Sequence, residues 1–270
     1  MSGIDSQQFI DSHCHLHDDR IFADIPHMVM RAQKAGVRYM VSCATMEDNF
    51  VQTARLASNF DSVIPCFGIH PWFLDSLSEN WQQTLEAFVA VPGAGIGETG
   101  LDFMDKGANR DLQLQVFSHH MMLARELERP INIHIRNAWD SFLRLLKKMG
   151  PLKTPGLIHS YSGSADMIPL LERYNLYISF SGSVTRPNAR KVVKALRAVS
   201  PDRFVIETDT PDIFPSFPNL EANQANKLNE PKNLVVIAHI AAQRRQMGFE
   251  EFVNHAYNNS LILFHPILPC

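Results

Sequence analysis

The sequence predicts an α/β protein folded as a single (β/α)8 barrel of the TIM type, and three observations lead to this prediction. Short apolar runs alternate with helix-like stretches along the chain, an alternation typical of a parallel sheet. Eight such units fit within the 270 residues, which favours a closed barrel. Metal-competent side chains follow six of the eight runs. We therefore expect residues 1–270 to form one domain, with its active site at the C-terminal ends of the strands.

The eight expected strands are short apolar runs that end in polar residues. They span residues 8–11, 38–43, 63–68, 93–97, 131–135, 155–158, 176–180 and 203–207. Their spacing of about 28 residues is close to the length of one βαβ unit. A doubly wound sheet is the alternative, but no glycine-rich turn follows the first run. The sequence G-x-G-x-x-G occurs at the fourth run, from Gly95 to Gly100, where Glu98 would repel a pyrophosphate.

Helical spacing is clear in four stretches between these runs, residues 24–35, 111–127, 188–199 and 232–243. In each of them apolar side chains recur three or four positions apart, so that they share one face of a helix. Residues 210–231 break the rhythm with several prolines and asparagines. Since this stretch follows the last strand, we expect a loop over the barrel mouth, where functional loops gather.

Composition excludes several classes of protein. The chain is 45% hydrophobic and 20% charged, which excludes a disordered chain. Its net charge of −3 argues against a broad surface that coats nucleic acid. The four cysteines form no CxxC pair, so we expect reduced thiols and a cytoplasmic location. No basic region followed by an apolar core stands at the N-terminal end and no apolar run is long enough to span a membrane, so we expect no signal peptide, no membrane span and no obligate protein partner.

The first expected strand ends in the sequence Asp-Ser-His-Cys-His, at positions 11–15. His13 and His15 are two residues apart, so their side chains point the same way and can share one metal ion. Glu98, after the fourth run, and Asp209, after the eighth, supply oxygen ligands. We expect these four side chains to meet at the mouth of the barrel.

His134 and His159 follow the neighbouring fifth and sixth runs, so they can meet on a second ion. Four histidines and two carboxylates exceed the needs of one tetrahedral site. They suit two divalent ions about 3.5–4 Å apart, and we expect Glu98 to bridge them. The mixed nitrogen and oxygen ligands leave Zn²⁺, Mn²⁺ and Mg²⁺ open as the metal.

Other polar residues at the strand ends have expected roles in catalysis or beside the ligands. Asp209 and Glu98 are the expected catalytic residues, with Asp209 as general base. Expected substrate contacts are His70, Arg136, Ser160 and Ser162. Glu207 and Asp102 are expected to lie beside the metal ligands and orient them. Two alternatives stay open: His70 forms a turn before Pro71, and Arg136 forms a structural ion pair with Asp102 or Glu207.

These motifs together resemble the TatD-type metal-dependent hydrolases, the TatD DNase family. The motifs are DSHCH at 11–15, GIHP at 68–71, GETGLD at 97–102, HIR at 134–136, HSYSG at 159–163, ETDTP at 207–211 and NEP at 229–231, followed by Asn259 and the Leu-Phe pair at 263–264. The resemblance implies a distorted TIM barrel with His13, His15, Glu98 and Asp209 on one ion and Glu98, His134 and His159 on the other. Two positions depart from the family's usual pattern. Thr99 stands where the family usually has an apolar residue or cysteine, which affects the packing beside the ligands. Trp72 is a bulky residue directly after the GIHP motif, which affects the shape of the substrate pocket.

The resemblance further implies hydrolysis, most commonly of phosphodiesters. We expect a metal-dependent deoxyribonuclease or phosphodiesterase, of 3′–5′ exonuclease type, that acts on nucleic-acid ends or on a small phosphodiester. One alternative is an amidohydrolase that uses the same binuclear site on a C–N bond, since the protein ligands do not distinguish the two reactions. An alternative of another class is a non-catalytic metal-binding barrel. It predicts a missing ligand, and none of the six is missing.

Overall fold

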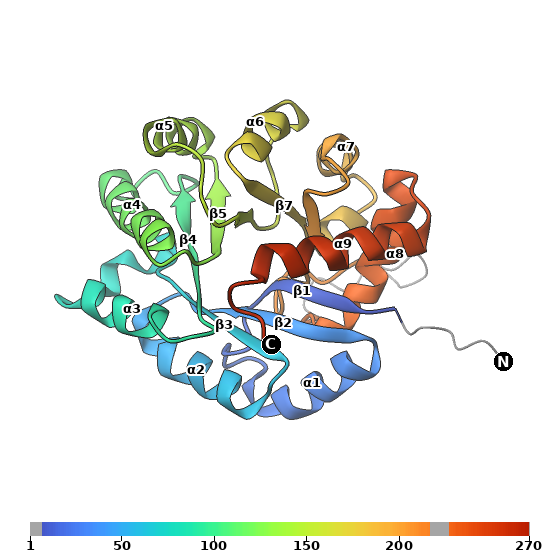
Figure 1. Cartoon of the computed structure of the whole chain (residues 1–270), viewed down its shortest axis with the longest axis horizontal. Coiled ribbons are helices and arrows are strands. Elements are labelled where there is room, and N and C mark those ends of the chain that lie inside the picture. Colours follow the sequence, from blue (N-terminus) through green and yellow to red (C-terminus); the bar gives the residue numbers. More distant parts are fainter. Residues whose placement is uncertain (1–6, 217–226, 270) are drawn as a thin grey trace.

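A computed structural model describes residues 7–216 and 227–269 and contains the predicted barrel (Figure 1). Eight strands pair in parallel in the order of the sequence, from the first to the eighth. They are β1 (Phe9–Cys14), β2 (Val37–Cys43), β3 (Val63–Phe67), β4 (Gly95–Asp102), β5 (Ile131–Arg136), β6 (Gly156–Ile158), β7 (Leu176–Phe180) and β8 (Phe204–Ile206). The strand order excludes the doubly wound sheet, in which the order reverses part of the way along the sheet.

Helices follow the strands around the outside of the barrel (Figure 1). They are α1 (Ile25–Lys34), α2 (Phe50–Asn59), α3 (Trp81–Val89), α4 (Arg110–Glu126), α5 (Trp139–Met149), α6 (Ile168–Arg173), α7 (Arg190–Ala198), α8 (Leu234–Arg245) and α9 (Phe249–Phe264). The four stretches with predicted helical spacing correspond to α1, α4, α7 and α8. None of the helices in the described ranges is long and apolar enough to cross a membrane.

The barrel is distorted where its first and last strands meet. The chain just beyond β8 is joined to β1 by two backbone hydrogen bonds, from His15 N to Thr210 O (2.6 Å) and from Asp209 N to His13 O (3.0 Å). The Ser12 hydroxyl adds a bond to Ile206 O (2.9 Å). Closure therefore depends on the polar segment after β8, and this segment places Asp209 directly beside His13 and His15.

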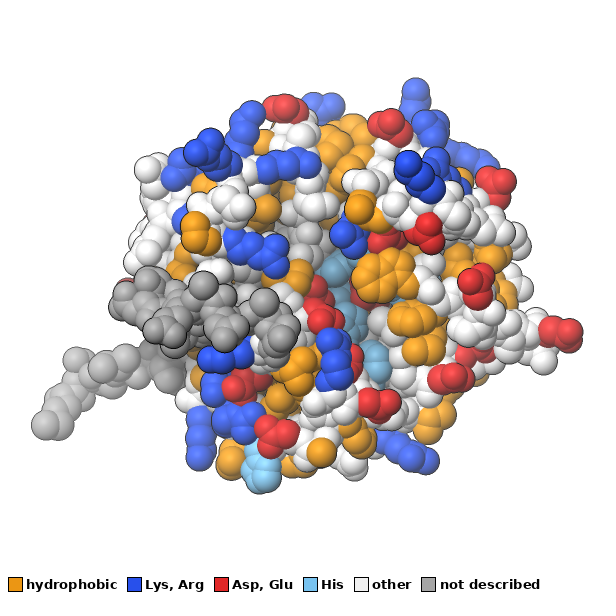
Figure 2. Space-filling view, turned by 180° about the vertical axis from the view of Figure 1, so that it is seen from behind, with side chains coloured by type: hydrophobic (Ala, Val, Ile, Leu, Met, Phe, Trp, Pro, Cys, Tyr) orange, Lys and Arg blue, Asp and Glu red, His pale blue; other side chains and the backbone are white. Residues whose placement is uncertain are grey.

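The final helix, α9, covers the N-terminal ends of the strands (Figure 1). Its residues Leu263 and Phe264 pack inside the barrel against Ile10, Ile64 and Val205. A larger apolar core fills the space between the strands and the surrounding helices. Since apolar side chains fill the N-terminal end, the polar residues gather at the opposite mouth. Figure 2 shows that mouth, with histidine and acidic side chains in a central hollow.

Three strands extend beyond the ends expected from the apolar runs. β1 continues to Cys14, β4 continues through Glu98 to Asp102, and β5 continues to Arg136. The apolar pattern stops early because the last residues of these strands carry the polar groups of the mouth. The backbone nevertheless continues to pair, with His134 opposite Gly100 in the register of β4 and β5.

The expected loop of residues 210–231 falls partly outside the described residues, which omit 217–226. Its two described ends lie together. Asn229 donates its backbone N–H to Pro211 O (2.8 Å) and its side-chain amide to Thr208 O (2.8 Å). The NEP motif therefore fixes the returning chain next to the segment that carries Asp209.

Candidate metal centre

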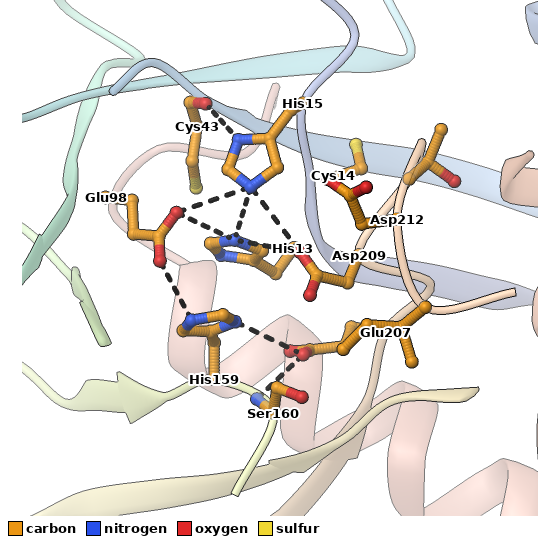
Figure 3. Close-up of polar contacts among 12 residues, drawn as sticks. His13, Cys14, His15, Cys43, Glu98, His159, Ser160, Glu207, Asp209 and Asp212 are labelled. Carbon is orange, nitrogen blue, oxygen red and sulfur yellow. Dashed lines mark hydrogen bonds and ion pairs between the residues drawn. The ribbon is translucent and has the colours of Figure 1, made fainter. Parts of the chain in front are cut away.

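His13 in β1 and His15 just after it direct one ring nitrogen each toward the same point (Figure 3). His15 Nδ1 lies 2.8 Å from the backbone oxygen of Cys43. A carbonyl oxygen only accepts hydrogen bonds, so Nδ1 carries a proton and the neutral ring has its lone pair on Nε2. The Nδ1 atom of His13 faces Asn132 Oδ1 at 3.2 Å. The two Nε2 atoms lie 3.2 Å apart.

Two carboxylate oxygens complete this first group of donor atoms. Glu98 Oε2 lies 3.5 Å from His13 Nε2 and 3.3 Å from His15 Nε2. Asp209 Oδ1 lies 3.7 Å and 3.4 Å from the same two nitrogens. Tetrahedral ligands at metal distances of about 2.0–2.2 Å are separated from one another by roughly 3.3–3.6 Å. These five separations, from 3.2 to 3.7 Å, are close to the spacing of ligands around one metal ion.

A second group forms around the other oxygen of Glu98. Glu98 Oε1 lies 2.9 Å from His159 Nε2 and 3.1 Å from His134 Nδ1. These two ring nitrogens are themselves 3.0 Å apart. Each carboxylate oxygen of Glu98 thus faces a different pair of histidines, so the arrangement suits two metal ions that share this residue.

Two further acids face the outer nitrogens of the second pair. Asp102 Oδ2 lies 3.4 Å from His134 Nε2, and Glu207 Oε1 lies 3.4 Å from His159 Nδ1. Glu207 is fully buried and also accepts a hydrogen bond from Ser160 N at 2.7 Å. A carboxylate behind a histidine holds a proton on the outer nitrogen and leaves the inner nitrogen free to bind metal. The orienting role expected for both acids stays a prediction.

Glycines allow the strand of Glu98 to approach its neighbour closely. Gly97 and Gly100 adopt φ values of 126° and 152°, which side chains with a Cβ rarely adopt. A Cβ on Gly97 would lie 2.7 Å from the backbone oxygen of Asn132 in β5. The G-x-G-x-x-G sequence therefore serves close packing between β4 and β5, and with it the placement of Glu98 beside His134.

The electrostatics of the group favour a bound cation. Burial alone would raise the pKa of Glu98, but the charge of His159, with smaller contributions from the neighbouring histidines, holds it well below its usual value. Burial would likewise raise the pKa of Asp209, but the hydrogen bond with His15 and the histidine charges lower it to about 2. Burial would lower the pKa of His15, but Asp209 and Glu98 raise it to about 9. The two carboxylates thus stay ionised and stabilise positive charge, which two divalent ions would provide.

His70 occupies a different position from the other histidines. Its Nδ1 accepts the backbone N–H of Trp72 at 3.2 Å, so the neutral ring carries its proton on Nε2. That Nε2 lies 3.4 Å from Glu98 Oε1. Burial lowers the pKa of His70 to about 4 and keeps the ring neutral. His70 therefore forms the turn before Pro71 and also presents a hydrogen-bond donor at the mouth.

The other expected substrate contacts lie farther from the centre of the site. The Arg136 side chain is about half exposed, with Nη1 4.0 Å from Asp102 Oδ2. This separation is long for an ion pair, and Arg136 lies at the C-terminal end of β5. Ser160 donates or accepts a hydrogen bond with Ser181 at 2.8 Å, and Ser162 donates to Ile135 O at 3.4 Å. Both serines are occupied by the protein's own groups.

Sequence reasoning missed two residues that position the site. Asn132 is fully buried in β5 and holds His13. His120 is fully buried in α4, and its Nε2 accepts the backbone N–H of Ile69, next to His70, at 3.0 Å. A polar residue within the apolar run of β5 is the signal for Asn132. His120 has no such signal, because its partner is a backbone group 51 positions away.

An eight-stranded parallel barrel whose buried histidines and carboxylates suit two metal ions has the architecture of a metal-dependent hydrolase. The model for TatD-related DNases matches residues 10–265 of the chain, and the chain belongs to this family of metal-dependent hydrolases. It is 30% identical over 257 residues to the uncharacterized metal-dependent hydrolase YabD of Bacillus subtilis, across 94% of this chain and 98% of YabD.

Two further similar proteins are a human enzyme and a bacterial protein of known structure. The human deoxyribonuclease TATDN3 is 29% identical to the chain, across 94% of each protein. The crystal structure of the TatD homologue YjjV from Escherichia coli K12 matches with a TM-score of 0.87 at 25% identity, across 96% of this chain and 98% of that one. The fold and the family therefore agree with the expectation from the sequence motifs.

Proposed function

We propose that this protein hydrolyses phosphodiester bonds, as a deoxyribonuclease of 3′–5′ exonuclease type that acts at strand ends. The observation that carries the proposal is Glu98, whose two oxygens face two separate pairs of histidine nitrogens. We assign His13, His15, Glu98 and Asp209 to one divalent ion and Glu98, His134 and His159 to the other. When bound, such ions lower the pKa of water and neutralise charge on a phosphoryl oxygen.

The protein's own residues would move the proton and hold the phosphate. Asp209 is ionised and lies at the mouth, so it is the proposed general base that takes the proton from the attacking water. His70 would donate from Nε2 to a substrate oxygen. The planar guanidinium of Arg136 suits two phosphate oxygens at once. Glu207 and Asp102 would keep His159 and His134 in the orientation that metal binding needs.

Two observations support a phosphodiester rather than an amide as the substrate. Arg136 places a positive charge at the mouth beside the second group of donors. The human relative is named a deoxyribonuclease, and the matching family is that of TatD-related DNases. The net charge of −3 supports contact with few phosphates, which fits strand ends better than a long duplex.

Reduced, buried cysteines at positions 14, 43 and 66 support a cytoplasmic location.

The test is the turnover of single-stranded DNA and of bis-p-nitrophenyl phosphate by metal-stripped protein, with Mg²⁺, Mn²⁺ or Zn²⁺ added back. Glu98→Ala removes the shared ligand. Asp212→Ala is the matched control, because Asp212 is an exposed acid of the same mouth that pairs with Arg20 at 2.9 Å. We expect metal-dependent cleavage that Glu98→Ala loses and Asp212→Ala keeps. Absence of phosphodiester cleavage, together with turnover of amide substrates, would favour the amidohydrolase alternative.

A further inference from the structure

A cavity of about 410 Å³ opens directly beside the candidate metal centre. It lies between the short helix η3 (Pro71–Ser76) and the chain that follows β4. Its lining includes Trp72, Asp102, Met104, Asn109, Gln113 and Arg136. Asp102 connects the cavity with the candidate metal centre, because its side chain lines the cavity and its Oδ2 lies 3.4 Å from His134 Nε2. A substrate held at the second group of metal ligands would therefore extend into this cavity.

Trp72 provides one wall of the cavity and is fixed in orientation. Its indole Nε1 donates a hydrogen bond to Asp102 Oδ2 at 2.7 Å, and its backbone N–H donates to His70 Nδ1. The ring meets His70 nearly at a right angle, with the centroids 4.8 Å apart. Even so, Trp72 is 62% exposed. The residue thus presents a large aromatic surface that is held in place before any ligand arrives.

Arg136 provides a cation on the same cavity. It follows His134 by two residues on β5, and it shares Asp102 with Trp72. The remaining wall is mixed, with apolar side chains such as Leu74 and Met104 beside the acids Asp75 and Asp105. A purely apolar group, such as an acyl chain, would remove these carboxylates and the Arg136 guanidinium from water without offering them a partner. A planar ring with polar edges, joined to an anion, matches both the aromatic surface and the cation.

We infer that this cavity binds the nucleobase next to the scissile phosphate, stacked on Trp72, while Arg136 contacts a phosphate of the same strand. The inference rests on the proposed phosphodiesterase function and names its substrate as a base-bearing nucleotide strand. Stacking on an aromatic side chain tolerates every base, because each base has a π-face. The site therefore distinguishes a strand with a base from one without, and it is tolerant of base identity. Figure 2 shows hydrophobic side chains along the border of the hollow that holds the histidines.

The test compares two substrates that differ in one base. One is a short thymidine oligonucleotide, and the other carries a tetrahydrofuran abasic residue at the position next to the scissile phosphate. In the wild type, kcat/KM should be higher for the complete oligonucleotide than for the abasic one. We expect this ratio, complete over abasic, to fall by about 5- to 150-fold in Trp72→Ala, the usual range for loss of one stacked base. Trp72→Phe keeps an aromatic face but loses the hydrogen bond to Asp102, so it should keep most of the ratio.

A binding measurement separates this inference from the proposed function. Thymidine 5′-monophosphate should quench the tryptophan fluorescence of the metal-loaded protein more strongly than deoxyribose 5-phosphate does, and this difference should vanish in Trp72→Phe. If the protein cleaves neither substrate yet shows this quenching, the phosphodiesterase proposal fails and the base site stands. An unchanged ratio in Trp72→Ala would overturn the inference. An equal fall in the Ala and Phe variants would also overturn it, since Trp72 would then act through Asp102.

Discussion

Replacement of Asp209 by asparagine separates the holding of a metal ion from the movement of a proton. The substitution keeps the size of the side chain and removes its negative charge. His13, His15 and Glu98 remain, with donor atoms 3.2–3.5 Å apart. Three protein ligands are enough for a catalytic metal site, so we expect Asp209→Asn to retain most of its bound metal.

The rate should fall sharply in the same variant. Loss of a positioned general base reduces turnover by about 10²- to 10⁴-fold, which corresponds to about 3–5 kcal/mol of activation free energy. The assay is kcat with bis-p-nitrophenyl phosphate, measured beside the metal content per chain. Asp212→Asn removes an equal charge from the same mouth, where Asp212 pairs with Arg20, and should keep both rate and metal.

Two results would refute this reasoning. A wild-type rate in Asp209→Asn would remove the role of Asp209 as base. A loss of both metal and rate would show that Asp209 is required as a ligand, so that its two roles cannot be separated.

Three other predictions follow from neighbouring contacts. Glu207→Gln should weaken the second metal site by about 10- to 100-fold, measured by metal titration, because Glu207 lies behind His159 at 3.4 Å; unchanged affinity would contradict the orienting role. Addition of Zn²⁺ at 100 times its Kd should raise the free energy of unfolding of stripped protein by about 2.7 kcal/mol for each occupied site, seen as a higher Tm; Glu98→Ala should lose most of this gain. His120 is buried, and burial lowers its pKa to about 4 in the folded protein, below the ordinary value of about 6.5 in the unfolded chain. As the pH falls between these two values, the unfolded chain takes up a proton that the folded protein does not, so the free energy of unfolding decreases. From about pH 7.5 to pH 5 this loss amounts to about 2 kcal/mol. The urea midpoint of metal-free His120→Phe should therefore depend less on pH than that of the metal-free wild type. An equal dependence on pH in both proteins would argue against a buried, neutral His120.

Two patterns in the sequence were enough to predict the barrel and the gathering of the metal-competent residues at one end of it. They are the alternation of strands with helices and the polar residues at the strand ends. The reason is physical: the carboxyl ends of parallel strands meet at one mouth, so residues such as His13 and Asp209 become neighbours although 196 positions separate them. In the structure the two oxygens of Glu98 face different pairs of histidines, and its role as a bridge between two ions stays a prediction.

Other features required three dimensions. The sequence does not reveal which ring nitrogen of each histidine faces the centre, because that depends on partners such as Cys43 O and Glu207. The hydrogen bond from Ile69 to His120 joins a strand end to a distant helix, without any periodic pattern. The role of Trp72 likewise depends on Asp102, 30 residues farther along the chain. A bulky residue after the GIHP motif was visible in the sequence, but the fixed orientation of its ring was not.

The most direct test of the central claim is anomalous X-ray diffraction from crystals grown with Mn²⁺ or Zn²⁺. The account predicts two anomalous peaks about 3.5–4 Å apart, one among His13, His15 and Asp209 and the other beside His134 and His159, with one oxygen of Glu98 on each. A single peak, or peaks that do not share Glu98, would contradict the two-metal centre proposed here.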